Sequence, residues 1–533
     1  MSVGPTSIAR ELAEPVGAGF APYAWAAAID EVAERHGVPR ETVLKFDQNT
    51  PALPGVPQVP LAESMARLNE YPDGTYRELR EAAASYTGLT PDHVVVGAGA
   101  DDIILLLAQT FLGPGKRAAA AVRTYALYRI ASTLRGAEIV PSGDEAELHW
   151  VCNPDNPTGT WVEPEEIAEL AGNVPRAIVV ADEAYLEYGA RTCAPWVDAL
   201  PNLVVLRTLS KAFGFASLRV GYAVAHPETA ALLTERRAPA PVAGPAAVIA
   251  AAALRHPRLG DVEATVVERE RVRGSLLAAG FDVPPTATNF LFVRTDEPLA
   301  DRLEAQGIVV RSFPEGIRVS IRRPSENDVL LRALGAEPGI SAGREATVLR
   351  TTTETALRLT LSLDGTGRTR VETGIGFVDH LLTLLAFHAG FDLELVAGGD
   401  LDVDEHHTVE DVHAALGAAL AQALGGREGV TRYGSAVVPM DEARATAAVD
   451  LVRRPHAEVA LSFRGDRVGA LAVSLLSHAL ERLTMEAGCT VHVESAGSDD
   501  HHVAEAAYKS LGQALRQAVA VTGGGIRSTK GAA

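Results

Sequence analysis

Cysteine is scarce in this sequence. The 533 residues include only three cysteines, Cys152, Cys193 and Cys489. They are too few and too far apart to form the disulfide framework that stabilises many small secreted domains. We therefore expect a protein of a reducing compartment, the cytoplasm.

The chain also lacks an excess of positive charge. It carries 48 lysines and arginines against 68 aspartates and glutamates, a formal net charge of −20. This balance argues against general binding to nucleic acid or to an anionic membrane surface. Phosphorylated small molecules stay open as ligands, because a few local arginines are enough to hold a phosphate.

No segment has the length and apolar character of a membrane span. The longest uncharged run, "APAPVAGPAAVIAAAAL" from Ala238, is slightly short for a bilayer and is interrupted by prolines. The N-terminal stretch has no basic region ahead of an apolar core, so we expect no signal peptide.

The length of the chain predicts two or three domains. Between about residues 45 and 236, apolar runs such as "AIVVADEAY" alternate with helical stretches, which predicts a mostly parallel sheet of an α/β fold. Residues 245–335 mix helical pattern with short strands and predict a smaller α+β lobe, completed by an N-terminal helix over residues 21–37. A stretch rich in Gly, Pro and Ser then marks a linker. The predicted organisation is one domain at residues 1–338, a linker at 339–345 and a second domain at 346–533.

The second domain repeats itself. "DEHHTVEDVHAALGAAL" from Asp404 matches "DDHHVAEAAYKSLGQAL" from Asp499, and "HLLTLLAFHAG" from His380 matches "HALERLTMEAG" from His478. Two matches in the same order, with nearly the same offset, indicate duplication of a unit of about a hundred residues. We therefore predict an α+β domain of two similar halves.

The repeated histidines and glutamates predict metal binding. Residues three and four apart share a helix face, whereas adjacent histidines point about 100° apart and suit different ions. Imidazole and carboxylate ligands without thiolate suit Mn, Fe, Co, Ni or Zn, and open coordination positions would make the site catalytic. A structural or storage metal site is the alternative. The predicted ligands are His380, His406, His407, Glu410, His478, His501, His502 and Glu505. The unrepeated histidines are expected to be ordinary surface or core residues, namely His388, His413, His456 and His492.

The segments "TGIGFVDHLL", "DEHHTVED", "DDHHVAEAAYK" and "RSTKG" resemble the imidazoleglycerol-phosphate dehydratase family, over essentially all of residues 346–533. The resemblance implies two Mn²⁺ ions on the eight ligands above. It also implies that Glu505 or Glu354 moves protons, with the assignment between the two left open. The implied substrate and phosphate contacts are Glu354, Arg432, Arg454, Lys509, Ser528 and Lys530.

The first domain carries a second set of reactive residues. "RTLSKAFG" places Lys211 after an apolar strand, and "VVADEAY" places Asp182 at the end of another, where α/β sheets bind ligands. Pyridoxal phosphate needs a lysine for its Schiff base and a carboxylate for its ring nitrogen. "VVGAGADDIILLL" adds a strand-to-helix turn suited to phosphate, with the amides of Ala100 and Asp101.

With "CNPDNPTG" and "SLRVGY", this set resembles the fold-type I aminotransferases, and within them histidinol-phosphate aminotransferase, over about residues 45–334. The resemblance makes Lys211 the Schiff-base lysine and Asp182 the partner of the ring nitrogen. Tyr71 would reach the cofactor of a partner subunit, which implies a dimer. Further implied cofactor contacts are Asn156, Tyr185, Tyr125, Ala100, Asp101, Thr208, Ser210 and Arg219. Arg311 and Arg318 would bind the phosphate or carboxylate of the substrate.

The two resemblances point to one pathway, histidine biosynthesis. The ketone formed by the dehydratase, imidazole-acetol phosphate, is the one that histidinol-phosphate aminotransferase aminates with glutamate. The chain is thus expected to be bifunctional and to form a homo-oligomer, a dimer through its first domain and possible shells of twenty-four subunits through its second. The alternatives for the first domain are an aromatic aminotransferase, a phosphothreonine decarboxylase or a non-catalytic scaffold.

Overall fold

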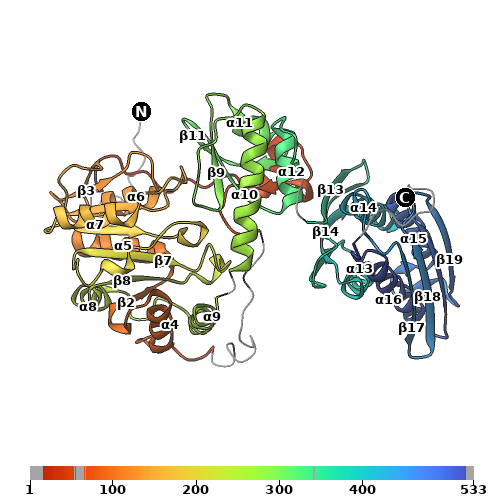
Figure 1. Cartoon of the computed structure of the whole chain (residues 1–533). Helices are drawn as coiled ribbons and strands as arrows, with labels where there is room; N and C mark the ends of the chain where they lie inside the picture. The colour runs from red at the N-terminus through yellow and green to blue at the C-terminus, as the bar shows by residue number, and fades with distance from the viewer. Residues whose placement is uncertain are drawn as a thin grey trace, which may run out of the picture. The chain divides into compact units, whose positions relative to one another are not determined.

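The computed structural model describes residues 16–52, 55, 65, 68–257, 259–339 and 343–523, which form two compact units (Figure 1). The first unit gathers the described residues of Met1–Ala26 with Phe46–Asp301 and Val309–Arg322. The second gathers Ala27–Lys45 and Arg302–Ile308 with the described residues of Arg323–Ala533. None of the described helices is long and apolar enough to cross a membrane.

A seven-stranded sheet forms the centre of the first unit, in the order β2-β8-β7-β6-β5-β3-β4. β8 runs antiparallel to β2 and β7, and the other neighbours are parallel. The sheet is therefore mostly parallel, as the alternating pattern predicts. Its strands are β2 (Val94–Gly97), β3 (Arg117–Ala120), β4 (Glu138–Pro141), β5 (Leu148–Cys152), β6 (Ile178–Asp182), β7 (Leu203–Thr208) and β8 (Gly221–Ala225).

Helices cover both faces of this sheet, so successive strand residues enter different cores. Val179 and Ala181 of β6 pack in one core, while Val180 between them packs in the other. The first core includes α4 (Arg77–Thr87), α7 (Pro164–Asn173), α9 (Gly244–Arg255) and α10 (Gly260–Ala278). The second includes α5 (Gly99–Phe111), α6 (Ala126–Leu134) and α8 (Pro227–Arg236).

The smaller lobe contains a three-stranded antiparallel sheet in the order β11-β12-β9. Its strands are β9 (Phe290–Arg294), β11 (Arg311–Phe313) and β12 (Gly316–Ser320). The predicted N-terminal helix is shorter than expected, because α2 spans only Ile29–His36 and residues 21–28 have no regular secondary structure. Four more short elements lie before residue 334, namely β1 (Leu44–Lys45), α11 (Leu299–Glu304), β10 (Ile308–Val309) and α12 (Pro324–Ala333).

Two halves of the same topology make up most of the second unit. Each has a four-stranded sheet, with orders β13-β14-β16-β15 and β17-β18-β22-β19, in which one strand pair is parallel. The predicted duplication is therefore confirmed. The first half comprises β13 (Glu345–Thr351), β14 (Thr355–Ser362), β15 (Thr369–Glu372), α13 (Gly376–Ala389), β16 (Asp392–Gly399) and α14 (His406–Leu424). The second comprises β17 (Tyr433–Met440), β18 (Ala443–Asp450), β19 (His456–Ser462), β20 (Arg467–Val468), β21 (Leu471–Ala472), α15 (Ser474–Ala487), β22 (Thr490–Ala496) and α16 (Asp500–Ala518).

The four helices of these halves share one core with both sheets. The glycine of the repeated Leu-Gly-x-Ala-Leu in α14 and in α16 explains how closely each of these helices packs against its neighbour. A Cβ on Gly417 would lie 2.2 Å from the main-chain oxygen of Leu483 in α15, and one on Gly512 would lie 2.5 Å from that of Leu385 in α13. Glycine at these two positions therefore lets α14 approach α15 and α16 approach α13.

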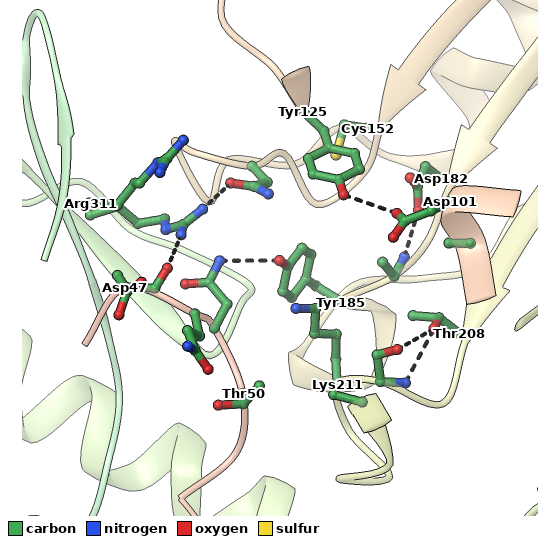
Figure 2. Close-up of a pocket in the computed structure, with 18 of the residues that line it drawn as sticks. Asp47, Thr50, Asp101, Tyr125, Cys152, Asp182, Tyr185, Thr208, Lys211 and Arg311 are labelled. Carbon is green, nitrogen blue, oxygen red and sulfur yellow. Dashed lines mark hydrogen bonds between the residues drawn. The ribbon is translucent and has the colours of Figure 1, made fainter. Parts of the chain in front are cut away.

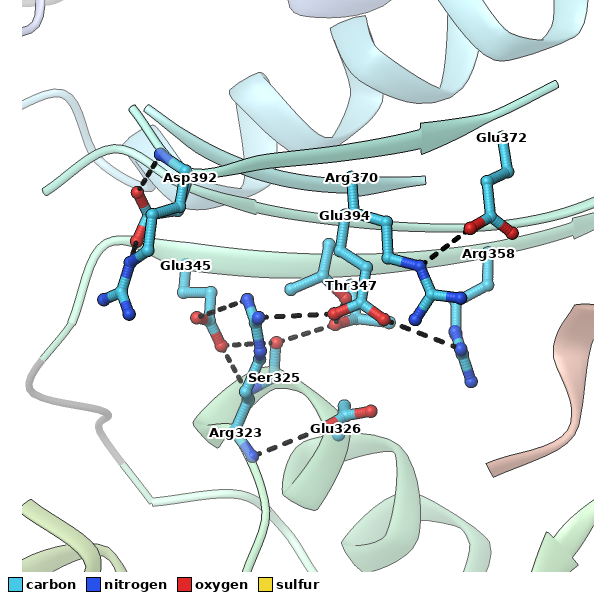
Figure 3. A network of polar contacts seen from close by, with 12 residues as sticks. Arg323, Ser325, Glu326, Glu345, Thr347, Arg358, Arg370, Glu372, Asp392 and Glu394 are labelled. Carbon is cyan, nitrogen blue, oxygen red and sulfur yellow. Dashed lines mark hydrogen bonds and ion pairs between the residues drawn. The ribbon is translucent and has the colours of Figure 1, made fainter. Parts of the chain in front are cut away.

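A polar network within the second unit joins α12 to the sheet of the first half (Figure 3). Arg323 Nη2 lies 3.3 Å from Glu394 Oε2, and the Ser325 hydroxyl donates to Glu345 Oε1 at 2.8 Å. The Ser325 hydroxyl also lies 2.7 Å from that of Thr347. These contacts satisfy polar groups that packing removes from water.

Candidate active sites

A cavity of about 300 Å³ opens at the carboxyl edge of the seven-stranded sheet. Cys152, Asp182 and Thr208, the last residues of β5, β6 and β7, line this cavity. Sheets of this kind bind their ligands at this edge. Figure 2 shows the side chains that converge there from the sheet and from the smaller lobe.

Asp182 is buried at the end of β6. The Tyr128 hydroxyl donates to its Oδ2 at 2.6 Å, and the Ala184 N–H donates to its Oδ1 at 3.1 Å. Burial raises the pKa of the Asp182 carboxyl to about 6, although the hydrogen bond from Tyr128 opposes the rise. A positive partner in the cavity would therefore stabilise the carboxylate strongly.

Lys211 follows β7 and points into the same cavity. Its Nζ lies 5.5 Å from the centroid of the Tyr185 ring. Burial, followed by the nearby charge of Arg318, lowers the pKa of Lys211 to about 8. A lysine with this pKa is neutral in about one tenth of the molecules at pH 7, far more than an ordinary lysine, and only the neutral amine is nucleophilic.

The start of α5 lines the same cavity as Lys211. Gly99 has φ +82°, and a Cβ there would lie 2.8 Å from Arg219 Nη2. Arg219 Nη2 is also 2.8 Å from Asp101 Oδ2, so the guanidinium lies against the first turn of the helix. The N–H groups of a helix start and an adjacent arginine suit a phosphate.

Hydroxyl groups line the same part of the cavity. Thr208 Oγ1 donates to Ser210 Oγ at 3.0 Å, and the Tyr125 hydroxyl donates to Asp101 Oδ1 at 2.9 Å. The structure thus brings together the predicted cofactor residues except Tyr71, which does not line the cavity and is 94% exposed.

Both arginines predicted to bind substrate line the cavity from the smaller lobe. Arg318 Nη1 donates to Asn156 Oδ1 at 2.5 Å, and its Nη2 donates to the main-chain oxygen of Asp47 at 2.6 Å. Arg311 Nη2 donates to the main-chain oxygen of Ala24 at 2.6 Å. Two guanidinium groups therefore offer positive charge to an anionic substrate.

Sequence reasoning missed several residues in and around this site, among them Tyr23, Trp25, Asn49 and Tyr128. Tyr23 and Trp25 line the cavity, and they lie in residues 21–28, which are not helical. Asn49 also lines it, and its Nδ2 donates to the Tyr185 hydroxyl at 3.1 Å. Tyr128 follows Tyr125 by three residues in a helical stretch, and this same-face spacing was the available signal.

Two clusters of possible metal ligands lie in the second unit. His380 joins His501 and Glu505 in one, and His478 joins His406 and Glu410 in the other, with the ligand atoms of each cluster within 4.8 Å of one another. Each cluster takes one histidine from one half and a His-x-x-x-Glu pair from the other. The duplication therefore builds both clusters from both halves.

The contacts of Glu505 show how one cluster is held together. His380 Nε2 is 2.7 Å and His501 Nε2 is 3.0 Å from Glu505 Oε1, and Lys509 Nζ donates to Oε2 at 2.5 Å. Burial alone would raise the pKa of Glu505, but these hydrogen bonds outweigh it and bring the pKa to about 2. In the other cluster, Arg482 Nε lies 3.0 Å from Glu410 Oε1.

The two remaining predicted ligands, His407 and His502, lie outside both clusters. His407 Nδ1 is 3.0 Å from Asp400 Oδ2, and His502 Nδ1 is 2.9 Å from Glu442 Oε2. These carboxylates raise the pKa of both histidines, and the charge of Glu354 adds to the effect at His407. Adjacent histidines thus diverge, as their 100° separation on a helix requires.

Among the predicted substrate contacts, Lys509 donates to Glu505 of one cluster, and Arg432 Nε donates to Asp450 Oδ1 at 2.7 Å. Arg454 and Glu354 are exposed. Ser528 and Lys530 lie outside the described residues.

The chain matches two family models. Aminotransferase class I and II matches residues 40–334, and imidazoleglycerol-phosphate dehydratase matches residues 373–515. Over 193 residues the chain is 49% identical to an imidazoleglycerol-phosphate dehydratase of Granulibacter bethesdensis, covering 36% of this chain and 98% of that protein. It is 48% identical over 200 residues to one of Chloroflexus aggregans, covering 37% and 98%.

Solved structures resemble the other part of the chain. One is histidinol-phosphate aminotransferase from Sinorhizobium meliloti in complex with pyridoxal-5'-phosphate, with 25% identity, TM-score 0.52, and coverage of 58% of this chain and 94% of that one. The enzyme from Clostridium acetobutylicum is also 25% identical, with TM-score 0.50 and coverage of 55% and 98%. The chain therefore belongs to two families, aminotransferase class I and II through its first part and imidazoleglycerol-phosphate dehydratase through its second.

Proposed function

We propose that this chain catalyses two consecutive steps of histidine biosynthesis. Its second part dehydrates imidazole-glycerol phosphate to imidazole-acetol phosphate, and its first part transfers an amino group from glutamate to that ketone, giving histidinol phosphate. The observation that carries the proposal is the presence, in one chain, of the Lys211–Asp182 cavity and of two His/Glu clusters built by duplication. The product of the clusters would be the substrate of the cavity.

The clusters fit two Mn²⁺ ions, because imidazole and carboxylate groups without thiolate suit this metal. When bound, the ions would stabilise negative charge on the imidazole ring of the substrate. His407 and His502 are the remaining two proposed ligands. They lie at the exposed starts of α14 and α16, so they would serve ions of other subunits in a large homo-oligomer.

The proton transfers of the dehydration are assigned to the chain's own glutamates. Glu505 is held ionised by His380, His501 and Lys509, which favours its use as a ligand. Both of its carboxylate oxygens are engaged, Oε1 by the two histidines and Oε2 by Lys509. Glu354 is exposed and belongs to neither cluster. We therefore assign the proton transfer to it. The proposed substrate and phosphate contacts are Arg432, Arg454, Lys509, Ser528 and Lys530.

The cavity of the first unit fits pyridoxal phosphate. Lys211 offers an amine, Asp182 offers a buried carboxylate for the ring nitrogen, and Arg219 with the start of α5 offers a phosphate site. When bound, the cofactor would withdraw electrons from the reacting carbon of the amino compound. Lys211 Nζ would then remove and return the proton of that carbon, while Arg318 and Arg311 hold the anionic groups of the substrate.

A coupled assay tests both activities at once. The purified chain, supplied with Mn²⁺ and pyridoxal phosphate, receives imidazole-glycerol phosphate and glutamate, and products are followed by NMR. We expect histidinol phosphate from the unaltered chain and accumulation of the ketone with Lys211→Ala. Accumulation of the ketone with the unaltered chain would mean that the first part does not aminate this ketone. It would then aminate another acceptor, such as an aromatic keto acid, or act as a non-catalytic scaffold. An absorbance band of bound cofactor that shifts with glutamate separates these two outcomes.

We further propose a cytoplasmic homo-oligomer. The 94% exposure of Tyr71 suits a residue that reaches the cofactor of a partner subunit, and a dimer through the first domain would bury it. The proposed domains remain residues 1–338 and 346–533.

A further inference from the structure

One buried polar pair in the second unit has no part in the proposed chemistry. His413 in α14 and Tyr508 in α16 are both 0% exposed, and His413 Nε2 lies 2.9 Å from the Tyr508 hydroxyl. His413 Nδ1 lies 2.7 Å from the main-chain oxygen of Val409, to which it must donate. Nε2 is therefore the acceptor of the Tyr508 proton. Burial lowers the pKa of His413 to about 4, so the ring is neutral and can accept at neutral pH.

The duplication makes these two residues equivalent. His413 stands seven residues after His406, and Tyr508 stands seven residues after His501. The two halves therefore contact each other through the same position of their last helices, with a histidine on one side and a tyrosine on the other. Because both side chains are buried, each polar atom depends on the other for its hydrogen bond.

The pair lies one helical turn beyond the metal clusters. His413 follows Glu410 by three residues, and Tyr508 follows Glu505 by three. α14 supplies two ligands of one cluster and α16 supplies two of the other. Metal–imidazole bonds are short, about 2.0–2.1 Å for zinc, so small rotations of either helix change the fit of its ligands.

We propose that the His413–Tyr508 hydrogen bond is a positioning contact that fixes α14 and α16 against each other and thereby holds both metal clusters in register. The inference rests on the proposed function, in that it takes the clusters to bind Mn²⁺. A hydrogen bond is directional, and so it restrains helix rotation in a way that apolar packing does not.

Tyr508→Phe tests the contact, because it removes one oxygen atom and keeps the ring. The full chain is freed of metal with chelator and titrated with Mn²⁺ by calorimetry and by electron paramagnetic resonance of the bound ion. We expect the dissociation constants of both ions to rise about tenfold, because a rotation of α14 or α16 would displace two ligands of a cluster. Tenfold is the lower end of the range for loss of groups that orient metal ligands. The resonance of bound Mn²⁺ should broaden as its ligands take several arrangements.

Ser510→Ala is the matched control. It removes another fully buried hydroxyl of α16, one that donates to the Ala507 carbonyl of its own helix at 2.9 Å. We expect this variant to keep both dissociation constants within twofold of the unaltered chain. Equal effects of the two variants would mean that any buried hydroxyl of α16 matters, which overturns the proposal.

An exchange of the pair gives a sharper test. In the variant that combines His413→Tyr with Tyr508→His, the new histidine can donate Nδ1–H to the Ala504 carbonyl, four residues earlier. We expect the exchange to bring both dissociation constants back to near their original values, which neither single change does. Unchanged Mn²⁺ binding in Tyr508→Phe, or a folded exchange variant that binds as weakly as the single ones, would overturn the inference. If the unaltered chain binds no Mn²⁺, the proposed function itself fails.

Discussion

Gly512 lies against the main-chain oxygen of Leu385, so closely that a Cβ on the glycine would be 2.5 Å from it. The contact lets α16 approach α13, the two helices that together supply His380, His501 and Glu505. The glycine at position 512 of the second half thus sets the distance between His380 of the first half and the two ligands of the second half.

Gly512→Ala should therefore separate α16 from α13. Because the obstructing atom belongs to the backbone, we expect a loss of about 1–3 kcal/mol in the free energy of unfolding. Chemical denaturation of the full chain, followed by a signal of the second unit, measures it. The control is Gly376→Ala at the start of α13 in the same unit, where no atom would contact the new Cβ, and it should be neutral or stabilise the chain by up to about 1 kcal/mol. An equal response of the two variants would contradict the close-packing argument.

Metal content should follow the composition of the clusters. We expect His380→Ala to lower bound manganese from two ions per chain to one, because it removes one ligand of a single cluster. Elemental analysis after dialysis measures the ratio. His388→Ala, on the same helix and outside both clusters, should retain both ions. Loss of both ions in His380→Ala would mean that the clusters bind metal only together.

Asp182 should make the cofactor-free chain less stable as pH rises. The pKa of its carboxyl is about 6 in the folded chain, against an ordinary value of 3.8, so the unfolded chain releases its proton first. The contribution of the Asp182 carboxyl to the free energy of unfolding is therefore fully present below about pH 4. It declines by about 3 kcal/mol as the pH rises to about 6. Asp182→Asn should remove this decline and be the more stable protein at pH 8. Denaturation curves at pH 4 and pH 8 test the sign, and parallel curves for the two proteins would refute it.

Lys211 should react with added pyridoxal phosphate as its amine loses a proton. Since the pKa of Lys211 is about 8, the rate of cofactor uptake by the cofactor-free chain should rise with pH through this value. Arg318→Gln removes a positive charge near the amine and should move the midpoint to higher pH. Stopped-flow absorbance measures the rates. Arg255→Gln, on α9 outside the cavity, should leave the midpoint unchanged.

Much of the site was predictable from local patterns. Lys211 and Asp182 stand at the ends of apolar strands, and residues at the ends of neighbouring strands in such a sheet meet at one edge. The repeated His-His-x-x-Glu places His406 and Glu410 on one face of α14, because residues four apart in a helix are neighbours. The duplication and the reactive residues were thus determined by the sequence alone.

Tertiary structure alone decided which residues meet. His380 joins α16 of the other half and not α14 of its own, because Gly512 lets α16 pack closely on α13. Tyr23 lines the cavity from a segment that is not helical, although the sequence predicts a helix there. These contacts join residues more than a hundred positions apart, and side-chain spacing along the chain carries no information about packing between helices.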